Sequence, residues 1–111
     1  EPVVLYLLHT RGAAYGYELG KALQEHALTD SPVDLPALYR TLQTLESNGY
    51  VTSAWDVGGS GPARHLYRLT PPGRQHLEDW LVVLERLAAS LGEFVAQARR
   101  RHADPETDTA A

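Results

Sequence analysis

The chain has 111 residues, of which 43% are hydrophobic and 22% charged, and its formal net charge is −4 at pH 7. This length suits one domain with a modest core, and no apolar run of about 18 residues is available to span a bilayer. The lack of cysteine excludes disulfides, thiol catalysis and thiolate metal sites. No secretory segment follows a basic start, so we expect a cytoplasmic protein that is not a membrane protein. Because the chain begins at Glu1 and contains no methionine, we also expect a few residues to precede it.

Acidic residues outnumber basic ones in both parts of the chain. Residues 1–70 carry five Lys and Arg against seven Asp and Glu, and residues 71–111 carry the same numbers. Neutralising phosphates requires clustered basic side chains, so this balance weighs against a large nonspecific nucleic-acid surface. A small, locally basic surface that reads DNA is still allowed.

Residues 2–11 predict a first helix that is apolar nearly all round, with Pro2 in its first turn and Gly12 as its stop. Such a helix requires burial on several sides. In so short a chain a second subunit can supply part of that burial, and we place Leu5 and Leu8 at this interface.

Residues 15–28 predict a second, amphipathic helix, followed by a short, turn-rich connector over residues 29–33. Its apolar face is expected to hold Tyr15, Leu19, Ala22, Leu23 and Ala27.

Residues 34–49 predict a short helix with one apolar and one polar face. Asp34 suits the N-cap, Pro36 is tolerated in the first turn, and Asn48-Gly49 ends the helix. The expected buried stripe is Leu35, Leu38, Leu42 and Leu45. The polar side holds Arg40, Thr44 and Ser47, with Thr41 and Gln43 at its flanks.

Residues 50–57 and 64–70 are rich in strand-forming side chains and flank the glycine-rich segment 58–62, which predicts a β-hairpin. Within it we interpret Trp55 as a packing residue of the hairpin and His65 as a surface residue.

Residues 71–101 predict the longest helix, with Thr70 as its N-cap and prolines in its first turn. Its apolar residues follow a heptad pattern over three heptads, which predicts a dimerisation seam. The seam comprises Leu77, Trp80, Leu84, Leu87, Leu91, Phe94 and Ala98. Residues 102–111 are expected to form a disordered tail.

This order of elements is that of a winged helix-turn-helix: a mainly α fold with a small β-hairpin, followed by a long C-terminal dimerisation helix. We expect a DNA-binding domain over residues 1–70 and the dimerisation helix over residues 71–101. A helix of this size fits the major groove, where Arg40 suits a bidentate contact to guanine. Hydrogen bonds to phosphates or base edges are expected from Thr41, Gln43, Thr44 and Ser47. The hairpin is then the wing, with Arg64 and Arg68 as expected DNA contacts, unless they pair with Asp56 across the strands.

Ordered blocks over residues 3–75 resemble the PadR family of bacterial transcriptional regulators. These blocks are Tyr15-Gly-Tyr-Glu, Ala37-Leu-Tyr-Arg-Thr-Leu, Leu45-Glu, Asn48-Gly-Tyr-Val51, Trp55 and Tyr67-Arg-Leu-Thr-Pro-Pro-Gly-Arg74. The resemblance implies a homodimeric repressor, often relieved by a small molecule, whose C-terminal helix crosses to the N-terminal helix of the other subunit. From the dimer we expect a pseudo-palindromic operator that takes the helix over residues 34–49 of each subunit in successive major grooves. The resemblance also implies a phosphate contact by the Tyr39 hydroxyl; the alternative is that Tyr39, at the edge of the apolar stripe, is simply a core residue. The chain departs from the family at Asp34-Leu-Pro-Ala37, where many relatives have Ser-Pro-Gly-Thr.

Two further interpretations remain open. Trp80 is expected in the core of the seam, but in a dimer it can form, with Tyr6 and Tyr15, an aromatic pocket for a planar effector. A winged-helix module that binds another protein instead of DNA is the alternative function. We expect no enzyme, no cofactor and no metal, because the glycine-rich segment fits neither a nucleophile elbow nor a phosphate loop and the five histidines stand far apart.

Overall fold

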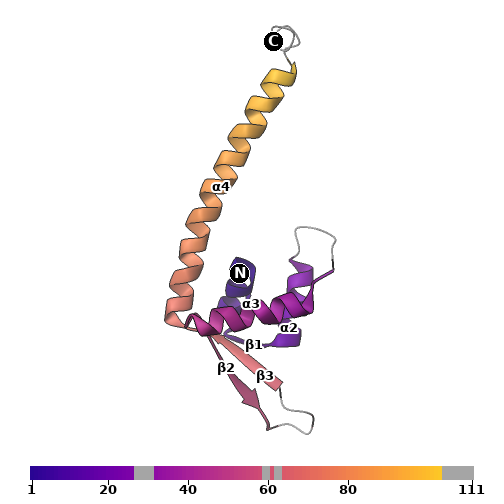
Figure 1. Ribbon diagram of the computed structural model, residues 1–111, viewed down its shortest axis with the longest axis vertical. Helices are drawn as coiled ribbons and strands as arrows, with labels where there is room; N and C mark the ends of the chain where they lie inside the picture. The colour runs from indigo at the N-terminus through magenta and orange to yellow at the C-terminus, as the bar shows by residue number, and fades with distance from the viewer. Residues whose placement is uncertain (27–31, 59–60, 62–63, 104–111) are drawn as a thin grey trace. The chain divides into compact units, whose positions relative to one another are not determined.

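The computed structural model describes residues 1–26, 32–58, 61 and 64–103, and Figure 1 shows the helices and strands that they form. In chain order these are α1 (Pro2–Arg11), β1 (Ala13–Tyr15), α2 (Gly16–Glu25), α3 (Leu35–Ser47), β2 (Val51–Asp56), β3 (Arg64–Leu69) and α4 (Pro71–Ala103). The chain divides into two compact units, residues 1–78 and 79–111. The mainly α architecture with a small sheet and a long last helix is therefore confirmed.

The sheet has three strands, so the predicted two-stranded hairpin was incomplete. Its order is β1-β3-β2 and both pairings are antiparallel, with Ala14 opposite Tyr67. The stretch that forms β1 is too short to show a strand period in the sequence. Tyr15, which we had placed on a helix face, is the last residue of β1, and its backbone N–H donates to the Glu18 carboxylate at 2.8 Å to cap α2.

The core of the first unit lies where α1 and α2 meet the sheet and α3. Its largest fully buried side chains are Leu5, Leu8, Leu19, Leu42, Leu45 and Val51. Each such burial contributes about 1.5–3 kcal/mol relative to an exposed side chain. Leu5 and Leu8 are buried by the chain's own residues, so they offer no surface to a second subunit; this corrects their expected place at the interface. The large apolar side chains that α1 leaves exposed are Val3 and Tyr6.

Helix α3 has the predicted ends. The Asp34 carboxylate accepts a hydrogen bond from the Ala37 N–H at 3.2 Å, and Gly49 takes φ 80° just after the C-cap. Three leucines of the predicted stripe are buried, but Leu35 is 48% exposed. Leu35 opens the helix at the margin of the core, where its side chain lies against Gly20 of α2, so the buried stripe is one residue shorter than predicted.

The start of α4 belongs to the first unit. The Thr70 hydroxyl accepts from the Gly73 N–H at 3.0 Å, which is the predicted N-cap, and donates to the Gly49 carbonyl at 2.6 Å. Leu77, which we had assigned to the dimerisation seam, is only 7% exposed because it packs within residues 1–78. The first two turns of α4 are therefore part of the core rather than of a free helix.

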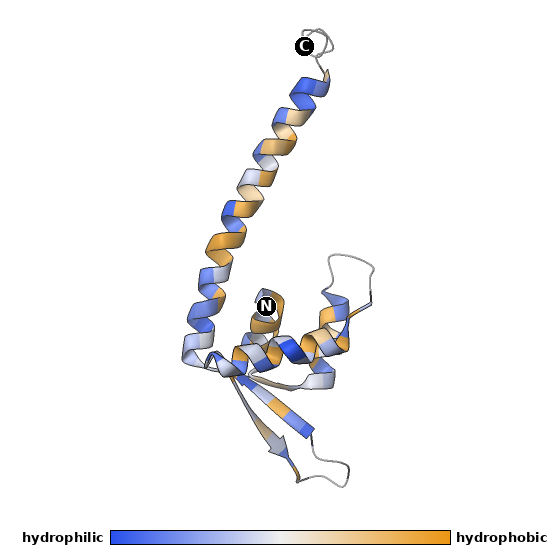
Figure 2. Ribbon diagram, in the orientation of Figure 1, coloured by the Kyte–Doolittle hydropathy of each residue, from blue (hydrophilic) through white to orange (hydrophobic). Residues whose placement is uncertain are grey.

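In the second unit, residues 79–103 continue α4 as one uninterrupted helix. Figure 2 shows apolar and polar residues recurring along it. The helix extends through His102 and Ala103, which were expected in the tail; residues 104–111 lie outside the described part of the chain. The end of the predicted second helix, including Ala27, also lies outside it. Within the described residues, no helix is long and apolar enough to cross a membrane.

Candidate nucleic-acid interface

Helix α3 turns its polar side to solvent, as its periodicity predicts. Leu38, Leu42 and Leu45 face the core and are at most 4% exposed. The opposite side is exposed at Tyr39, Arg40, Gln43, Thr44 and Ser47, and Thr41 is half-buried at its margin. The structure thus brings all the α3 residues of the predicted DNA contact onto one accessible side of one helix.

Two contacts fix α3 against the rest of the first unit. At its C-terminal end, the Ser53 hydroxyl of β2 donates to the Glu46 carboxylate at 2.5 Å. At its N-terminal half, the Tyr39 ring lies against Gly16, the first residue of α2; a Cβ at Gly16 would be 2.7 Å from Tyr39 Cε1. Tyr39 is therefore both exposed and held in place by the neighbouring helix.

The wing pairs β2 and β3 in a register that separates its side chains onto two faces. Ser53, Tyr67 and Ala14 share the face that packs towards α3 and the core. Arg64 and Arg68 lie on the other face, because side chains alternate along a strand. Both arginines are exposed. Arg68 lies nearer the base of the wing, opposite Thr52, whereas Arg64 lies at its outer end.

Arg64 is held by aromatic rings. It lies directly opposite Asp56 in the strand register, which suggested an ion pair. Instead, its guanidinium lies 5.6 Å from the ring centre of Tyr15 and 5.9 Å from that of Tyr17. The two tyrosine rings are stacked at 5.8 Å, and Arg64 donates a weak hydrogen bond of 3.4 Å to the Tyr17 hydroxyl.

The Asp56 carboxylate is occupied by other donors. The Tyr15 hydroxyl donates to Oδ2 at 2.5 Å, and the Gly58 N–H donates to Oδ1 at 3.1 Å. The bond from Tyr15, helped by that from Gly58 and by the nearby Arg64 charge, lowers the pKa of Asp56. The same hydrogen bond raises the pKa of Tyr15. The pair therefore holds its charged carboxylate and neutral phenol at neutral pH.

A second aromatic group lies on the core-facing side of the wing. Trp55 stacks on His65, with ring centres 4.2 Å apart, and His65 Nδ1 lies 3.1 Å from the Tyr67 hydroxyl. His65 is thus half-buried in a stack, not simply at the surface as predicted. Burial, reinforced by Glu46 and Tyr39, raises the pKa of Tyr67. Trp55 packs within the wing as expected, yet it is still 63% exposed.

The wing, α2 and α3 together enclose a hollow of about 430 Å³. Aromatic rings and one guanidinium line it, and the lining contains no carboxylate: Tyr15, Gly16, Tyr17, Tyr39, Trp55, Arg64, His65 and Tyr67. Tyr17 had not been expected at a functional site, and His65 had been interpreted as a surface residue of the wing. Their grouping depends on pairings between β1, β2 and β3 that no local pattern reveals.

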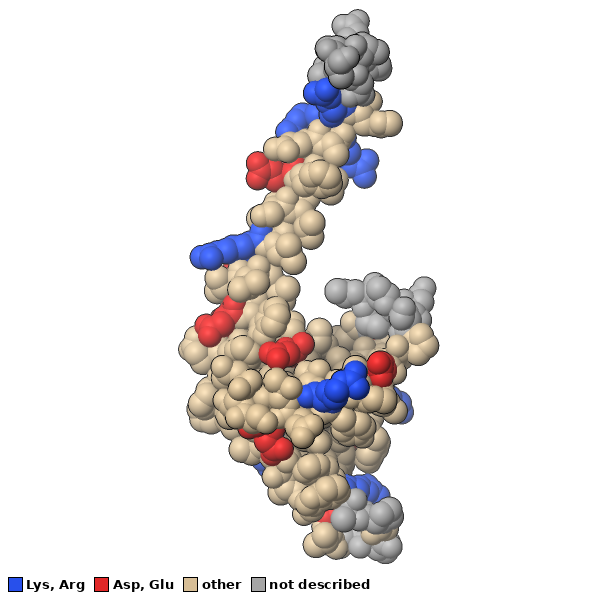
Figure 3. Space-filling view, viewed as in Figure 1, with Lys and Arg blue, Asp and Glu red and all other residues tan. Residues whose placement is uncertain are grey.

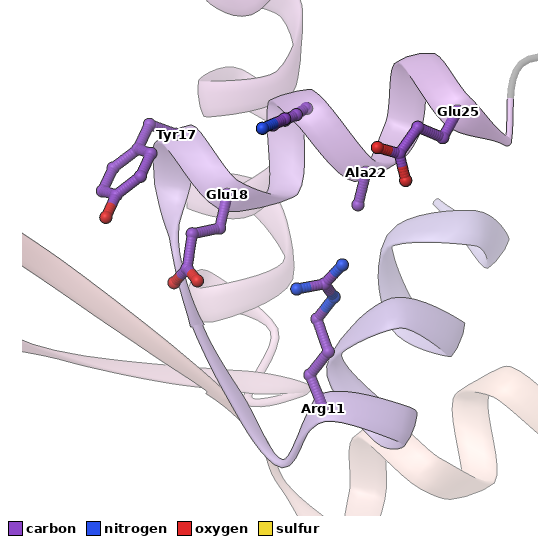
Figure 4. Close-up of a pocket in the computed structure, with 6 residues that line it drawn as sticks. Arg11, Tyr17, Glu18, Ala22 and Glu25 are labelled. Carbon is purple, nitrogen blue, oxygen red and sulfur yellow. The ribbon is translucent and has the colours of Figure 1, made fainter.

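Another hollow, of about 340 Å³, lies between the end of α1 and the side of α2 (Figure 4). Figure 4 shows Arg11 reaching from α1 towards α2, where Glu18 and Glu25 also border the hollow. Lys21 adds a second cation. The mixed charges make this hollow a poorer fit for a polyanion than the wing side. Figure 3 likewise shows cations of the first unit standing singly on the visible face, with acidic groups nearby.

The predicted dimerisation residues divide between the two units. Leu5, Leu8 and Leu77 are buried in the first unit, whereas the seam of the second unit is exposed over several turns. Its exposed members are Leu84, Leu87, Leu91 and Phe94, at 37%, 51%, 54% and 65%. Trp80 is half-buried.

The residues of the predicted effector pocket have different neighbours. The Tyr6 ring contacts His26 edge-on at 6.1 Å, and Tyr15 belongs to the group around Asp56 and Arg64. The described contacts therefore do not bring Tyr6 and Tyr15 into one pocket within the first unit. Among the described residues, no group of three His, Asp or Glu side chains is arranged to hold a metal ion.

Comparison with known proteins gives consistent matches. A family model described as the transcriptional regulator PadR-like family matches residues 4–79. The transcriptional regulator Rv3488 of Mycobacterium tuberculosis is 38% identical over 88 residues, which cover 78% of each chain. A PadR family transcriptional regulator from Eggerthella lenta is 34% identical with a TM-score of 0.67, over 83% of this chain and 80% of that one. Bacillus subtilis PadR, solved in complex with operator DNA, is 27% identical with a TM-score of 0.63, over 73% of this chain and 45% of that one.

Proposed function

Because the chain belongs to the PadR-like family of transcriptional regulators, we propose that it is a homodimeric repressor that binds operator DNA through α3 and the wing. The observation that carries this proposal is α3 itself. The helix is capped at Asp34, anchored by three buried leucines, and presents its polar residues on one open side. The relative from Bacillus subtilis, solved with operator DNA, supports the same use of this fold.

In this proposal the exposed side of α3 enters the major groove. Arg40 is assigned to a guanine through two parallel hydrogen bonds, and Tyr39 to a backbone phosphate. Phosphate or base-edge contacts are assigned to Thr41, Gln43, Thr44 and Ser47. Arg64, at the outer end of the wing, is assigned to a phosphate beside the groove, and Arg68, nearer the base, to a secondary contact.

Dimerisation is assigned to the second unit. The exposed heptad residues of α4 require a partner, since a lone helix with such a stripe leaves large apolar side chains in water. A dimer carries two copies of α3 and fits a pseudo-palindromic operator whose half-sites lie about 34 Å apart. Each subunit offers few cations to DNA, but two linked subunits gain affinity by binding both half-sites at once. DNA binding is therefore compatible with the acidic net charge.

We further propose that a small aromatic effector relieves repression and that Trp80 lies at its site. The chain has two tryptophans, so Trp55→Phe leaves Trp80 as the sole indole reporter. Titrating aromatic compounds should quench this fluorescence saturably, and Trp80→Phe should abolish the response. A signal from Trp80 that no compound changes would contradict the effector proposal.

The DNA-binding proposal is tested by fluorescence anisotropy with duplexes from the promoter of the chain's own gene. Specific binding should appear at nanomolar to micromolar protein, exceed that of a shuffled duplex, and weaken with salt. The logarithm of the affinity should fall only gradually with the logarithm of the salt concentration, because each subunit offers few phosphate contacts. Failure to bind any promoter duplex, together with capture of a defined protein by α3, would favour the alternative module that binds protein.

A further inference from the structure

Side chains far apart in sequence fasten the wing to the start of α2, and the shortest of these contacts joins Tyr15 to Asp56. Tyr15 ends β1 immediately before α2, and Asp56 ends β2 at the outer part of the wing. Their hydrogen bond of 2.5 Å joins residues 41 positions apart. Strands β1 and β2 do not pair directly, because β3 lies between them. The contact therefore spans the sheet at its outer end.

This contact also determines where Arg64 lies. Because Asp56 gives its carboxylate oxygens to Tyr15 and Gly58, the guanidinium of Arg64 lies over the tyrosine rings instead. Tyr17 adds a hydrogen bond and a second ring surface. An exposed arginine ordinarily samples many rotamers, and ordering it on binding costs free energy. Arg64 is already held in place by this arrangement.

We propose that Tyr15 and Asp56 are positioning residues for DNA binding, which hold the wing against α2 and present the Arg64 guanidinium to an operator phosphate. This inference rests on the proposed function and assigns a role to two residues that do not themselves touch DNA. It explains why an acidic side chain lies beside the wing's DNA-contacting arginine. If the carboxylate had only its charge, it would repel the phosphates that Arg64 attracts.

The two roles of Asp56 predict changes of opposite sign. Asp56→Ala and Asp56→Asn remove the same negative charge, but only asparagine keeps an acceptor oxygen for the Tyr15 hydroxyl. If Asp56 acts by charge alone, both variants bind operator equally and more tightly than the parent. If it acts by positioning, Asp56→Ala binds about three- to tenfold more weakly than Asp56→Asn.

The decisive experiment measures operator affinity by anisotropy for the full chain and four variants: Asp56→Ala, Asp56→Asn, Tyr15→Phe, and Tyr15→Phe with Asp56→Ala. We expect Tyr15→Phe to weaken binding at least as much as Asp56→Ala, because it removes the contact but keeps the carboxylate charge. The double variant should be no weaker than Tyr15→Phe, since both substitutions remove the same contact. Glu25→Gln, on the exposed side of α2, is the matched charge control and should leave affinity unchanged or slightly higher. Circular dichroism and thermal melting establish that each variant is folded.

Equal affinities for Asp56→Ala and Asp56→Asn, or additive losses in the double variant, would overturn the inference while leaving the proposed function intact. A second measurement does not require DNA. In a Trp80→Phe background, Trp55 adjoins Asp56 and reports wing motion through its fluorescence anisotropy decay. Asp56→Ala should add a fast component that Asp56→Asn lacks; an unchanged decay would contradict the wing attachment even if the parent chain bound no operator.

Discussion

The ring of Tyr39 lies against the backbone of Gly16, so that a side chain at Gly16 would occupy the place of the ring. A Cβ there would be 2.7 Å from Tyr39 Cε1 and 2.9 Å from the Tyr39 hydroxyl oxygen. The atoms in conflict are the far end of a side chain rather than backbone. Tyr39 would therefore swing away and α2 would remain intact.

Gly16→Ala should consequently separate DNA binding from stability. We expect operator affinity to fall about three- to tenfold, because the Tyr39 hydroxyl would leave the position from which it is proposed to bind a phosphate. The melting temperature should change little, because alanine is a better helix former than glycine. Tyr39→Phe keeps the ring and removes the hydroxyl, so it should reproduce the loss of affinity. A fall in affinity with Gly16→Ala but none with Tyr39→Phe would exclude a phosphate contact by the Tyr39 hydroxyl.

Arg40→Ala should weaken operator binding by about 1–3 kcal/mol and relax the base preference at one position of each half-site. The side chain is exposed on the open side of α3, so its truncation should leave the fold and the dimer unchanged. Anisotropy against operators substituted at single positions measures both effects. Arg86→Ala, in the second unit, makes the same charge change at a residue outside α3 and serves as control. Equal binding by Arg40→Ala and the parent would exclude Arg40 as the reading residue.

Leu87→Asp and Leu91→Asp should weaken self-association at least about tenfold, because each places a charge in an apolar seam. Both leucines are about half exposed in the single chain, so the first unit should still fold. Sedimentation velocity over a concentration series reports the association, and circular dichroism reports the fold. Ser90→Asp, between them in sequence but off the seam, is the control. Unchanged sedimentation of the leucine variants would place the dimer contact elsewhere.

Gly73→Ala should destabilise the first unit by about 2–4 kcal/mol. A Cβ at Gly73 would be 2.0 Å from the backbone oxygen of Tyr50 and 2.6 Å from Leu69 Cδ1, so backbone must move. Urea unfolding followed by circular dichroism measures the loss. Gly92→Ala provides the matched helical control, since a Cβ there meets nothing within 4 Å in the single chain. It should be neutral or stabilise the chain by up to about 1 kcal/mol. Similar stabilities for the two variants would mean that Gly73 is not tightly packed.

The contribution of the contact between Tyr15 and Asp56 to stability should depend on pH at both extremes. The pKa of Asp56 is lowered in the fold, so its contribution is present at neutral pH and is lost as the pH falls through that pKa. The pKa of Tyr15 is raised, so its contribution is lost as the pH rises through it. The difference in free energy of unfolding between parent and Asp56→Ala should therefore be largest near neutral pH and shrink towards pH 3. A difference that is constant with pH would contradict this linkage.

The sequence predicted those features that repeat within one helix or strand. The buried Leu38, Leu42 and Leu45 of α3 and the exposed heptad residues of α4 from Leu84 onward follow from local periodicity. Asp34 caps α3 as its residue type predicts. The prediction that Leu35 is buried was wrong because periodicity alone does not show where the core ends. Strand β1 was missed because three residues, Ala13–Tyr15, carry too short a pattern to outweigh the helical signal that follows them.

The grouping at the wing was beyond prediction for a different reason. Tyr15, Asp56 and Arg64 come from three strands, and they meet only because β3 lies between β1 and β2. The strand register alone would pair Arg64 with Asp56, as the sequence suggested. Instead, Tyr15 takes the Asp56 carboxylate, and the rings of Tyr15 and Tyr17 hold the Arg64 guanidinium. The position of Tyr17 depends on the direction in which α2 leaves the sheet.

The junction at Thr70 has a consequence for how this chain can be recombined with others. Through its backbone N–H and hydroxyl, Thr70 is hydrogen-bonded to Tyr50 and Gly49, where the chain leaves α3, and it also caps α4. The start of α4 and the segment that follows α3 are thus joined by hydrogen bonds within the first unit. A chimera that keeps residues 1–70 and replaces the chain from residue 71 onward would lose residues 71–78, which are part of the first unit. A graft made after Glu78 would exchange the second unit and leave the first unit whole.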